Sequence, residues 1–217
     1  MPDRSLRTLV LVSAIVSALL YGVVAALLVD APPIQADGAA VLAWVRPNRS
    51  MVLASVCTWS VCVAATWTFL TAAWGVFTAF EGKPGVLSLL AWGAGFATFT
   101  LSLVGFSAAL ALAWLAFALT PEAAHVLNSL ALLPVSITGM TTALSIVPWI
   151  LLARRHALFS LPLQAFSALV TALHIVSMGA FAAEGLLSPS GVGVLVAPLC
   201  YYAWMVWVGV EMWRRKT

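Results

Sequence analysis

Long apolar stretches separated by short polar breaks form the main pattern of this sequence. Each stretch reaches the roughly 20 residues that an α-helix needs to cross a bilayer core about 30 Å thick. Six candidate spans follow from the pattern: residues 8–29, 51–80, 90–118, 132–153, 162–183 and 192–213. We therefore expect an all-α fold, a polytopic membrane bundle of six transmembrane helices that forms one domain over residues 1–217.

Two of the polar breaks carry signals of their own. Residues 30–50 separate the first two spans, and within them Gly38–Trp44 predicts a short helix that lies on the membrane surface. Thr120-Pro121-Glu122 predicts a helix start, because threonine caps helices, proline suits the first turn and a carboxylate stabilises the positive end of the helix dipole. With six spans, both breaks fall on the same side of the membrane.

The composition agrees with this pattern. Hydrophobic residues make up 63% of the chain, charged residues 8%, and the mean hydropathy is +1.07. Soluble domains carry roughly 45–50% apolar and about 25% charged residues. A water-soluble globule, a disordered chain and a nucleic-acid-binding module are excluded on this ground. The formal net charge of +3 is explained by orientation in a bilayer, not by a nucleic-acid partner.

The basic residues are divided unequally between the two sides of the predicted membrane. The side that holds both termini carries Arg4, Arg7, Lys83, Arg154, Arg155, Arg214, Arg215 and Lys216, and the other side carries Arg46 and Arg49. Cytoplasmic loops of membrane proteins are enriched in lysine and arginine. We therefore expect a multi-pass protein of the bacterial plasma (inner) membrane with both termini in the cytoplasm.

The first apolar stretch has a second interpretation, a cleaved secretory signal peptide. Arg4 and Arg7 precede it and Val29-Asp30-Ala31 follows it. Its length exceeds the roughly 7–15 apolar residues of a signal peptide, and Pro32 would directly follow the cleavage site. We expect a retained span, but the sequence leaves cleavage open.

Small and weakly polar residues recur at helical spacing on one face of several spans. Such residues are typical of contacts between membrane helices. His174, in the fifth span, is the only ionisable side chain deep in the predicted membrane, about 18 Å from the start of its helix at 1.5 Å per residue. The candidate intramembrane polar site comprises His174, Thr171, Ser167 and Gln164 of that span, with Thr141, Thr142, Trp67 and Tyr202 from other spans.

Two interpretations of His174 remain open at this stage. An ionisable residue inside a membrane marks a candidate functional site. The alternative is a neutral histidine that hydrogen-bonds a threonine hydroxyl across a helix contact. Trp59, Trp67 and Trp74 raise a similar choice, because they recur at intervals of eight and seven residues on one face of the second span. That stripe predicts either helix packing and lipid contact or a pocket for a hydrophobic ligand.

No set of residues in the spans predicts catalysis, a metal site or a cofactor. An enzyme needs an acid, base or nucleophile within mutual reach, and the spans contain no deeply buried acidic residue. Glu211 comes closest, but we expect it to pair with Arg215 at the membrane boundary. His125 and His156 fall in loops on opposite sides, so neither reaches the depth of His174 to complete a haem site. The three cysteines do not have metal-ligand spacing.

The chain resembles the small six-helix membrane proteins of unknown function that are common in actinobacteria. The likeness lies in the layout over nearly the full length, and four segments carry it: Asp37-Gly38-Ala39-Ala40-Val41-Leu42-Ala43-Trp44, Glu81-Gly82-Lys83-Pro84-Gly85, Thr120-Pro121-Glu122 and Ala197-Pro198-Leu199. The resemblance implies a six-helix fold in a bacterial membrane. It implies no reaction, ligand or functional residue.

We therefore expect a non-enzymatic integral membrane protein, an accessory or assembly subunit without a cofactor. Its expected partners are membrane lipids and either further copies of the chain or another membrane protein. The alternative is a carrier or sensor that binds a small hydrophobic molecule between helices near His174.

Overall fold

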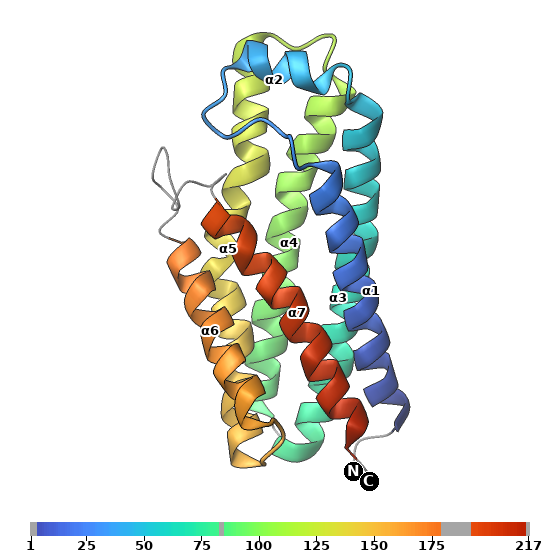
Figure 1. Cartoon of the computed structure of the whole chain (residues 1–217), viewed down its shortest axis with the longest axis vertical. Coiled ribbons are helices and arrows are strands. Elements are labelled where there is room, and N and C mark those ends of the chain that lie inside the picture. Colours follow the sequence, from blue (N-terminus) through green and yellow to red (C-terminus); the bar gives the residue numbers. More distant parts are fainter. Residues whose placement is uncertain (1–3, 83–84, 179–191, 216–217) are drawn as a thin grey trace.

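The computed structural model describes residues 4–82, 85–178 and 192–215, and these residues are helical almost throughout (Figure 1). Side chains are described for all of them except residues 135–136 and 192–195. The described helices are α1 (Arg4–Leu27), α2 (Gly38–Val45), α3 (Arg49–Glu81), α4 (Val86–Trp114), α5 (Pro121–Arg155), α6 (Leu161–Ser177) and α7 (Val192–Arg214). The described ranges contain no strand, so the all-α prediction is confirmed.

Four helices are long and apolar enough to cross a bilayer: α1, α3, α4 and α5. The 33 residues of α3 extend about 50 Å, which exceeds a hydrocarbon core of about 30 Å. A helix of this length crosses such a core either tilted or with its ends beyond the apolar layer. The described part of α6 is apolar over 17 residues, and α7 has 23. The count of six spans stays a prediction.

The helix bounds differ from the predicted spans because hydropathy marks only the lipid-embedded part of a helix. α5 begins at Pro121, eleven residues before the predicted span 132–153, with the side chain of Thr120 accepting a hydrogen bond from the N–H of Ala123. The predicted helix start at Thr120 is thereby confirmed. The span predicted at 162–183 extends past residue 178, outside the described residues.

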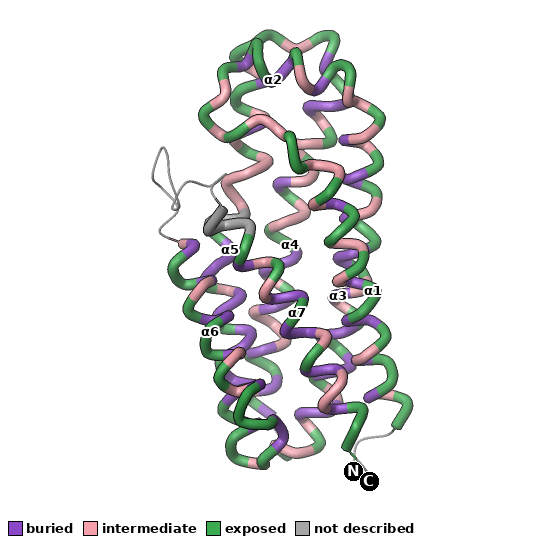
Figure 2. Tube along the Cα trace, in the orientation of Figure 1, coloured by how far each residue is buried: buried purple, intermediate pink, exposed green. Residues whose placement is uncertain are grey.

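The long helices form a closed ring in chain order. Each of α1, α3, α4, α5, α6 and α7 packs against the next, and α7 packs back against α1. α2 lies across one end of this bundle, and both chain termini lie at the other end (Figure 1). Figure 2 shows buried positions on the inward faces of the helices and exposed positions on the outward faces.

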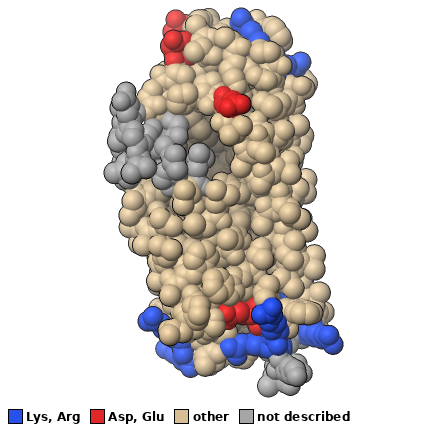
Figure 3. Space-filling view, viewed as in Figure 1, with Lys and Arg blue, Asp and Glu red and all other residues tan. Residues whose placement is uncertain are grey.

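Basic residues gather at the end that holds the termini (Figure 3), and we call it the basic end. Its described members are Arg4, Arg7, Arg154, Arg155, Arg214 and Arg215; the predicted Lys83 and Lys216 lie outside the described residues. The outward surface between the two ends is apolar: Leu19 is 66% exposed, Val104 62% and Leu169 52%. Apolar surface exposed over most of the bundle length fits a lipid environment.

Two carboxylates at the basic end cap the starts of neighbouring helices. Glu81 accepts hydrogen bonds from the N–H groups of Leu87 (2.8 Å) and Ser88 (2.9 Å) and from the Ser88 hydroxyl (2.6 Å). Glu211 accepts them from the N–H (2.7 Å) and hydroxyl of Ser160, which precedes α6. These bonds satisfy N–H groups that a helix cannot satisfy itself, at the positive end of its dipole.

The carboxyl of Glu81 lies at the end of α3, beyond its apolar stretch. Burial alone would raise its pKa, but the hydrogen bonds from Ser88 and Leu87 and the nearby charge of Arg155 outweigh burial and hold the pKa below its usual range. The caps at the basic end therefore favour the charged form of this side chain.

The ion pair predicted between Glu211 and Arg215 is replaced by contacts of both side chains with the α5–α6 loop. Glu211 binds Ser160 as described above. The guanidinium of Arg215 donates to the carbonyl oxygens of Leu158 (2.9 Å) and Ala157. The prediction failed because one turn of separation shows that two side chains are close but not which loop packs against them.

The two arginines at the α2 end bind the carbonyl end of α4. Arg46 Nε donates to the carbonyl of Ala116 (3.0 Å), and Arg49 Nε donates to that of Ala113 (3.1 Å). The guanidinium of Arg49 also lies 5.3 Å from the ring centre of Trp114. Positive charge stabilises the negative end of a helix dipole, so these arginines close the end of α4.

The helix predicted over Gly38–Trp44 is confirmed as α2, and its apolar face packs on protein. Val41, Leu42 and Val45 are buried in a cluster with residues at the end of α4 and the start of α5. Asp37 caps the helix by accepting from the N–H of Ala40 (2.7 Å). α2 therefore covers the end of the bundle.

Gly38 is required where α2 meets α5, because a Cβ atom there would overlap the carbonyl oxygen of Pro121. We expect Gly38→Ala to displace α2 and to lower the free energy of unfolding by about 1–3 kcal/mol, measured by denaturation of the detergent-solubilised protein. Gly93→Ala is the matched control, because a Cβ at Gly93 meets nothing within 4 Å. Equal stability of the two variants would show that the contact is not tight.

Candidate functional site

His174 lies between α5, α6 and α7. Its side chain is 6% exposed, and Nδ1 lies 2.9 Å from the carbonyl oxygen of Val170, one turn earlier on α6. Because a carbonyl only accepts, Nδ1 carries the hydrogen in this contact. The imidazole meets the ring of Tyr201 from α7 edge to face, with ring centres 5.8 Å apart. A Cβ at Gly139 of α5 would overlap the carbonyl of His174, so the α5 and α6 backbones touch here.

The other predicted residues of α6 bind α6 to its neighbours. Ser167 Oγ accepts a hydrogen bond from Trp204 Nε1 of α7 at 2.8 Å. Thr171 donates to the carbonyl of Ser167 within its own helix (2.8 Å). Gln164 lies at the basic end, where it donates to the carbonyl of Phe159 (2.9 Å) and accepts from Arg154 Nε (3.2 Å). The polar stripe thus joins α6 to α7 and closes the α5–α6 loop.

Thr141 and Thr142 of α5 contact α4. The hydroxyl of Thr98 donates to Thr141 Oγ1 at 2.7 Å and lies 3.5 Å from Thr142 Oγ1. No hydrogen bond between described residues joins either threonine to His174. These threonines therefore seal the α4–α5 contact.

Tyr202 lies where α1, α3 and α7 meet. Its hydroxyl is 3.5 Å from Cys62 Sγ, and that thiol also contacts the carbonyl oxygen of Ser17 at 3.4 Å. Thr66 completes this polar contact by donating to Ser17 Oγ at 3.2 Å. Trp67 is elsewhere, stacked on Phe96 of α4 with ring centres 4.5 Å apart. The eight predicted site residues are thus divided among separate helix contacts.

The tryptophan stripe of α3 is an aromatic zipper with α4. Each tryptophan faces an aromatic ring of the antiparallel helix, in the pairs Trp59–Phe106 (4.7 Å between ring centres), Trp67–Phe96 (4.5 Å) and Trp74–Trp92 (6.0 Å). Stacked pairs of this kind contribute roughly 0.5–1.5 kcal/mol beyond the area they bury. Of the two interpretations of the stripe, these pairs agree with helix packing.

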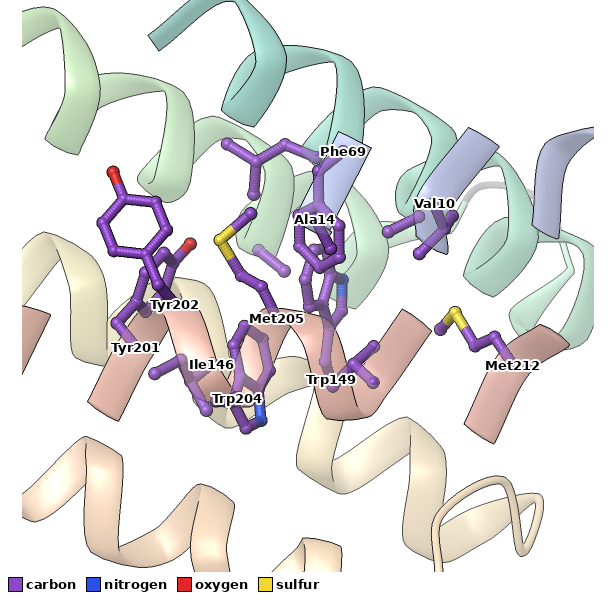
Figure 4. Close-up of a cluster of buried hydrophobic side chains, with 14 of the residues drawn as sticks. Val10, Ala14, Phe69, Ile146, Trp149, Tyr201, Tyr202, Trp204, Met205 and Met212 are labelled. Atoms are coloured by element: carbon purple, nitrogen blue, oxygen red, sulfur yellow. The ribbon is translucent and has the colours of Figure 1, made fainter. Parts of the chain in front are cut away.

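Large side chains also fill the centre of the bundle toward the basic end (Figure 4). Trp149 of α5 and Trp204 of α7 are fully buried and stack with ring centres 5.8 Å apart. Phe69 of α3 meets both of them edge to face, at 5.9 and 6.4 Å. The three rings bring α3, α5 and α7 into one core.

A few polar atoms in this core have no hydrogen-bond partner among the described residues. They include the hydroxyl of Tyr201 and Oγ of Ser145, two buried groups that lie against each other without the geometry of a full hydrogen bond. Ser145 Oγ lies against α4, 2.9 Å from where a Cβ on Gly95 would be. Buried hydroxyls are normally paired. The ring of Tyr201 also contacts the ring of His174, so the hydroxyl of Tyr201 is the incompletely bonded group nearest to the predicted site.

The remaining titratable groups lie apart from His174. His125 Nδ1 contacts the carbonyl of Ala36 at the α2 end, and His156 follows α5 at the basic end. Within the described ranges no three His, Cys, Asp or Glu side chains cluster as a metal site would require. All three cysteines are free, with Cys62 buried and Cys57 exposed. What the described arrangement provides is hydrogen bonding between helices.

No protein-family model, curated protein or solved structure matches this chain. The family resemblance suggested by the sequence therefore stays a prediction.

The bond from Trp204 to Ser167 allows a direct test of the α6–α7 contact. Trp204→Phe removes the donor and Ser167→Ala the acceptor, so we expect each to lower the free energy of unfolding by about 1 kcal/mol. The double variant should lose less than the sum, with a coupling of about 0.6 kcal/mol. Thr58→Ala is the control, since its exposed hydroxyl bonds only the carbonyl of Ala54. Additive losses would contradict the contact.

Proposed function

We propose that this chain is a non-enzymatic integral membrane protein of the bacterial plasma membrane, an accessory or assembly subunit. In this proposal it crosses the bilayer six times, with both termini in the cytoplasm. Its partners are lipids and either copies of itself or another membrane protein.

The sidedness of charge supports the six-span arrangement. The termini and six arginines share the basic end, and two arginines bound to α4 occupy the α2 end. Basic residues remain on the cytoplasmic side of membranes, so the basic end faces the cytoplasm. With α6 and α7 crossing the bilayer as well, an even number of spans returns the chain to that side.

One observation carries the subunit role: many of the described polar groups inside the bundle are bonded by their own helix or by a neighbouring one. Ser167 is bonded by Trp204, and Thr98 bonds Thr141. Stacked tryptophans fill the space between these contacts. The outward faces, which remain apolar and exposed, are the surfaces available to lipids and to a partner in the membrane.

Two measurements test this proposal: the membrane topology of the chain and the mass of the complex that it forms. A fluorescent reporter fused after Thr217 should be active, whereas a secreted-type phosphatase should be active only when inserted after Asp30. Solubilised from its own membrane in mild detergent, the chain should migrate well above its 22.9 kDa, with a partner or further copies at fixed stoichiometry by native mass spectrometry. A lone monomer would contradict the subunit role. An active phosphatase fused at Thr217 would contradict the proposed topology.

A second candidate function is that of a carrier or sensor of a small hydrophobic molecule near His174. The observation in its favour is the buried pair of hydroxyls of Tyr201 and Ser145, which lie against each other, with the ring of Tyr201 in contact with the imidazole. His174→Ala should then reduce ligand binding or transport at least severalfold while the protein accumulates normally. Unchanged binding by a normally accumulating variant would count against this candidate.

A further inference from the structure

An open groove lies on the outward face of α1 at the basic end. Its volume is about 500 Å³, and the described residues that line it are Arg4, Ser5, Thr8, Leu9 and Val12. Positions three or four apart on a helix lie one above the other, so these five residues share one face of α1. All five are exposed. The groove therefore runs along the surface of α1 that faces away from the bundle.

The groove is polar at one end and apolar at the other. Arg4, Ser5 and Thr8 belong to the first turns of α1, at the end where basic residues gather (Figure 3). Leu9 and Val12 follow toward the middle of the bundle. From Arg4 to Val12 the helix rises about 12 Å at 1.5 Å per residue, and one leaflet contributes about 15 Å of hydrocarbon. The groove thus has the order of a phospholipid, with the polar group at the membrane boundary and the apolar chain toward the midplane.

Arg4 is the charged side chain of the groove. No described residue forms a hydrogen bond or ion pair with its guanidinium, and the hydroxyl of Thr8 bonds only its backbone carbonyl, at 3.1 Å. Arg7, one turn further on, is 6% exposed and donates to the carbonyl of Arg215 at 2.6 Å. Arg7 therefore binds α1 to the end of α7, whereas the guanidinium of Arg4 remains available to a ligand in the groove.

Charge indicates which headgroup fits. The described lining holds one cation and no carboxylate. The described carboxylates of the basic end, Glu81 and Glu211, cap the starts of α4 and α6. A guanidinium binds phosphate oxygens through charge-assisted hydrogen bonds, whereas a headgroup amine would find no opposite charge in this lining. Asp3 precedes Arg4 in the sequence but lies outside the described residues, so its charge needs a variant of its own. The described groove complements an anionic headgroup.

We propose that the groove on α1 binds one anionic phospholipid. The guanidinium of Arg4 donates to the phosphate, and one acyl chain lies along Leu9 and Val12. Because the groove is open on its outer side, its occupant stays in contact with the surrounding membrane, as a phospholipid does and a water-soluble phosphate does not. This inference rests on the proposed function, since it requires α1 to lie in the bilayer, and it specifies one of the proposed lipid partners.

Two lipids that differ only in their headgroups test the proposal. The full chain is delipidated in detergent and titrated with palmitoyl-oleoyl phosphatidylglycerol, which is anionic, or with the corresponding phosphatidylcholine, which is zwitterionic, and bound lipid is counted by native mass spectrometry. The first phosphatidylglycerol should bind about fivefold more tightly than the first phosphatidylcholine.

Variants locate the bound lipid. Arg4→Gln removes the charge and Leu9→Trp fills the apolar part of the groove, so each should weaken phosphatidylglycerol binding about fivefold. Arg154→Gln and Leu169→Trp make the same changes on α5 and α6 and should keep the native affinity within twofold. Asp3→Asn should bind phosphatidylglycerol at least as tightly as the native chain. Melting temperatures of all variants control for folding.

The other outcomes overturn the proposal in different ways. Equal affinity for the two lipids would remove charge from the recognition. Equal losses in Arg4→Gln and Arg154→Gln would assign binding to the total charge of the basic end. Weaker binding by Asp3→Asn would show that a carboxylate takes part. Displacement of the lipid by an excess of glycerol phosphate would indicate a site for a soluble anion. The reporter fusions and the mass of the complex test the proposed function separately, so its failure is distinguishable from failure of this inference.

Discussion

The hydrocarbon core of a bilayer offers no water to polar groups, and the whole structure is arranged around that constraint. A backbone or side-chain polar group left unbonded in lipid costs several kcal/mol. Backbone groups inside a helix hydrogen-bond one another. The groups that still need partners are therefore those at helix ends and on inward side chains. Glu81 and Glu211 satisfy N–H groups at the basic end, and Arg46 and Arg49 satisfy carbonyls at the α2 end. Inside, serine and threonine hydroxyls bond carbonyls one turn back or a neighbouring helix.

The same constraint explains which features could be predicted from the sequence. Local signals were sufficient for the all-α fold, for α2 and for the start of α5 at Thr120, since each depends on residues a few positions apart. The cap formed by Glu211 joins residues 51 positions apart and depends on α7 packing beside α6. A single sequence shows how apolar a helix is but not which helix is its neighbour.

The candidate site also shows that a single sequence does not reveal which helices are neighbours. Equal depth along the spans grouped His174 with Thr141, Trp67 and Tyr202, yet the ring order of the helices separates them. Thr141 faces α4, Trp67 pairs with Phe96, and Tyr202 meets α1. Depth fixes one coordinate, whereas the direction in which each side chain points follows from packing. Packing also decides that Arg7 points inward while Arg4 lines the groove on α1.

The central claim is that the outward faces of all six long helices contact lipid while their polar faces meet inside. Spin labels on a cysteine-free background test it most directly, at Leu169 of α6, which is 52% exposed, and at Leu19 of α1. In lipid vesicles both labels should relax readily with membrane-dissolved oxygen and be shielded from an aqueous nickel complex. A Leu169 label as open to nickel as one at Ala31, in the loop before α2, would place α6 outside the bilayer and contradict the account.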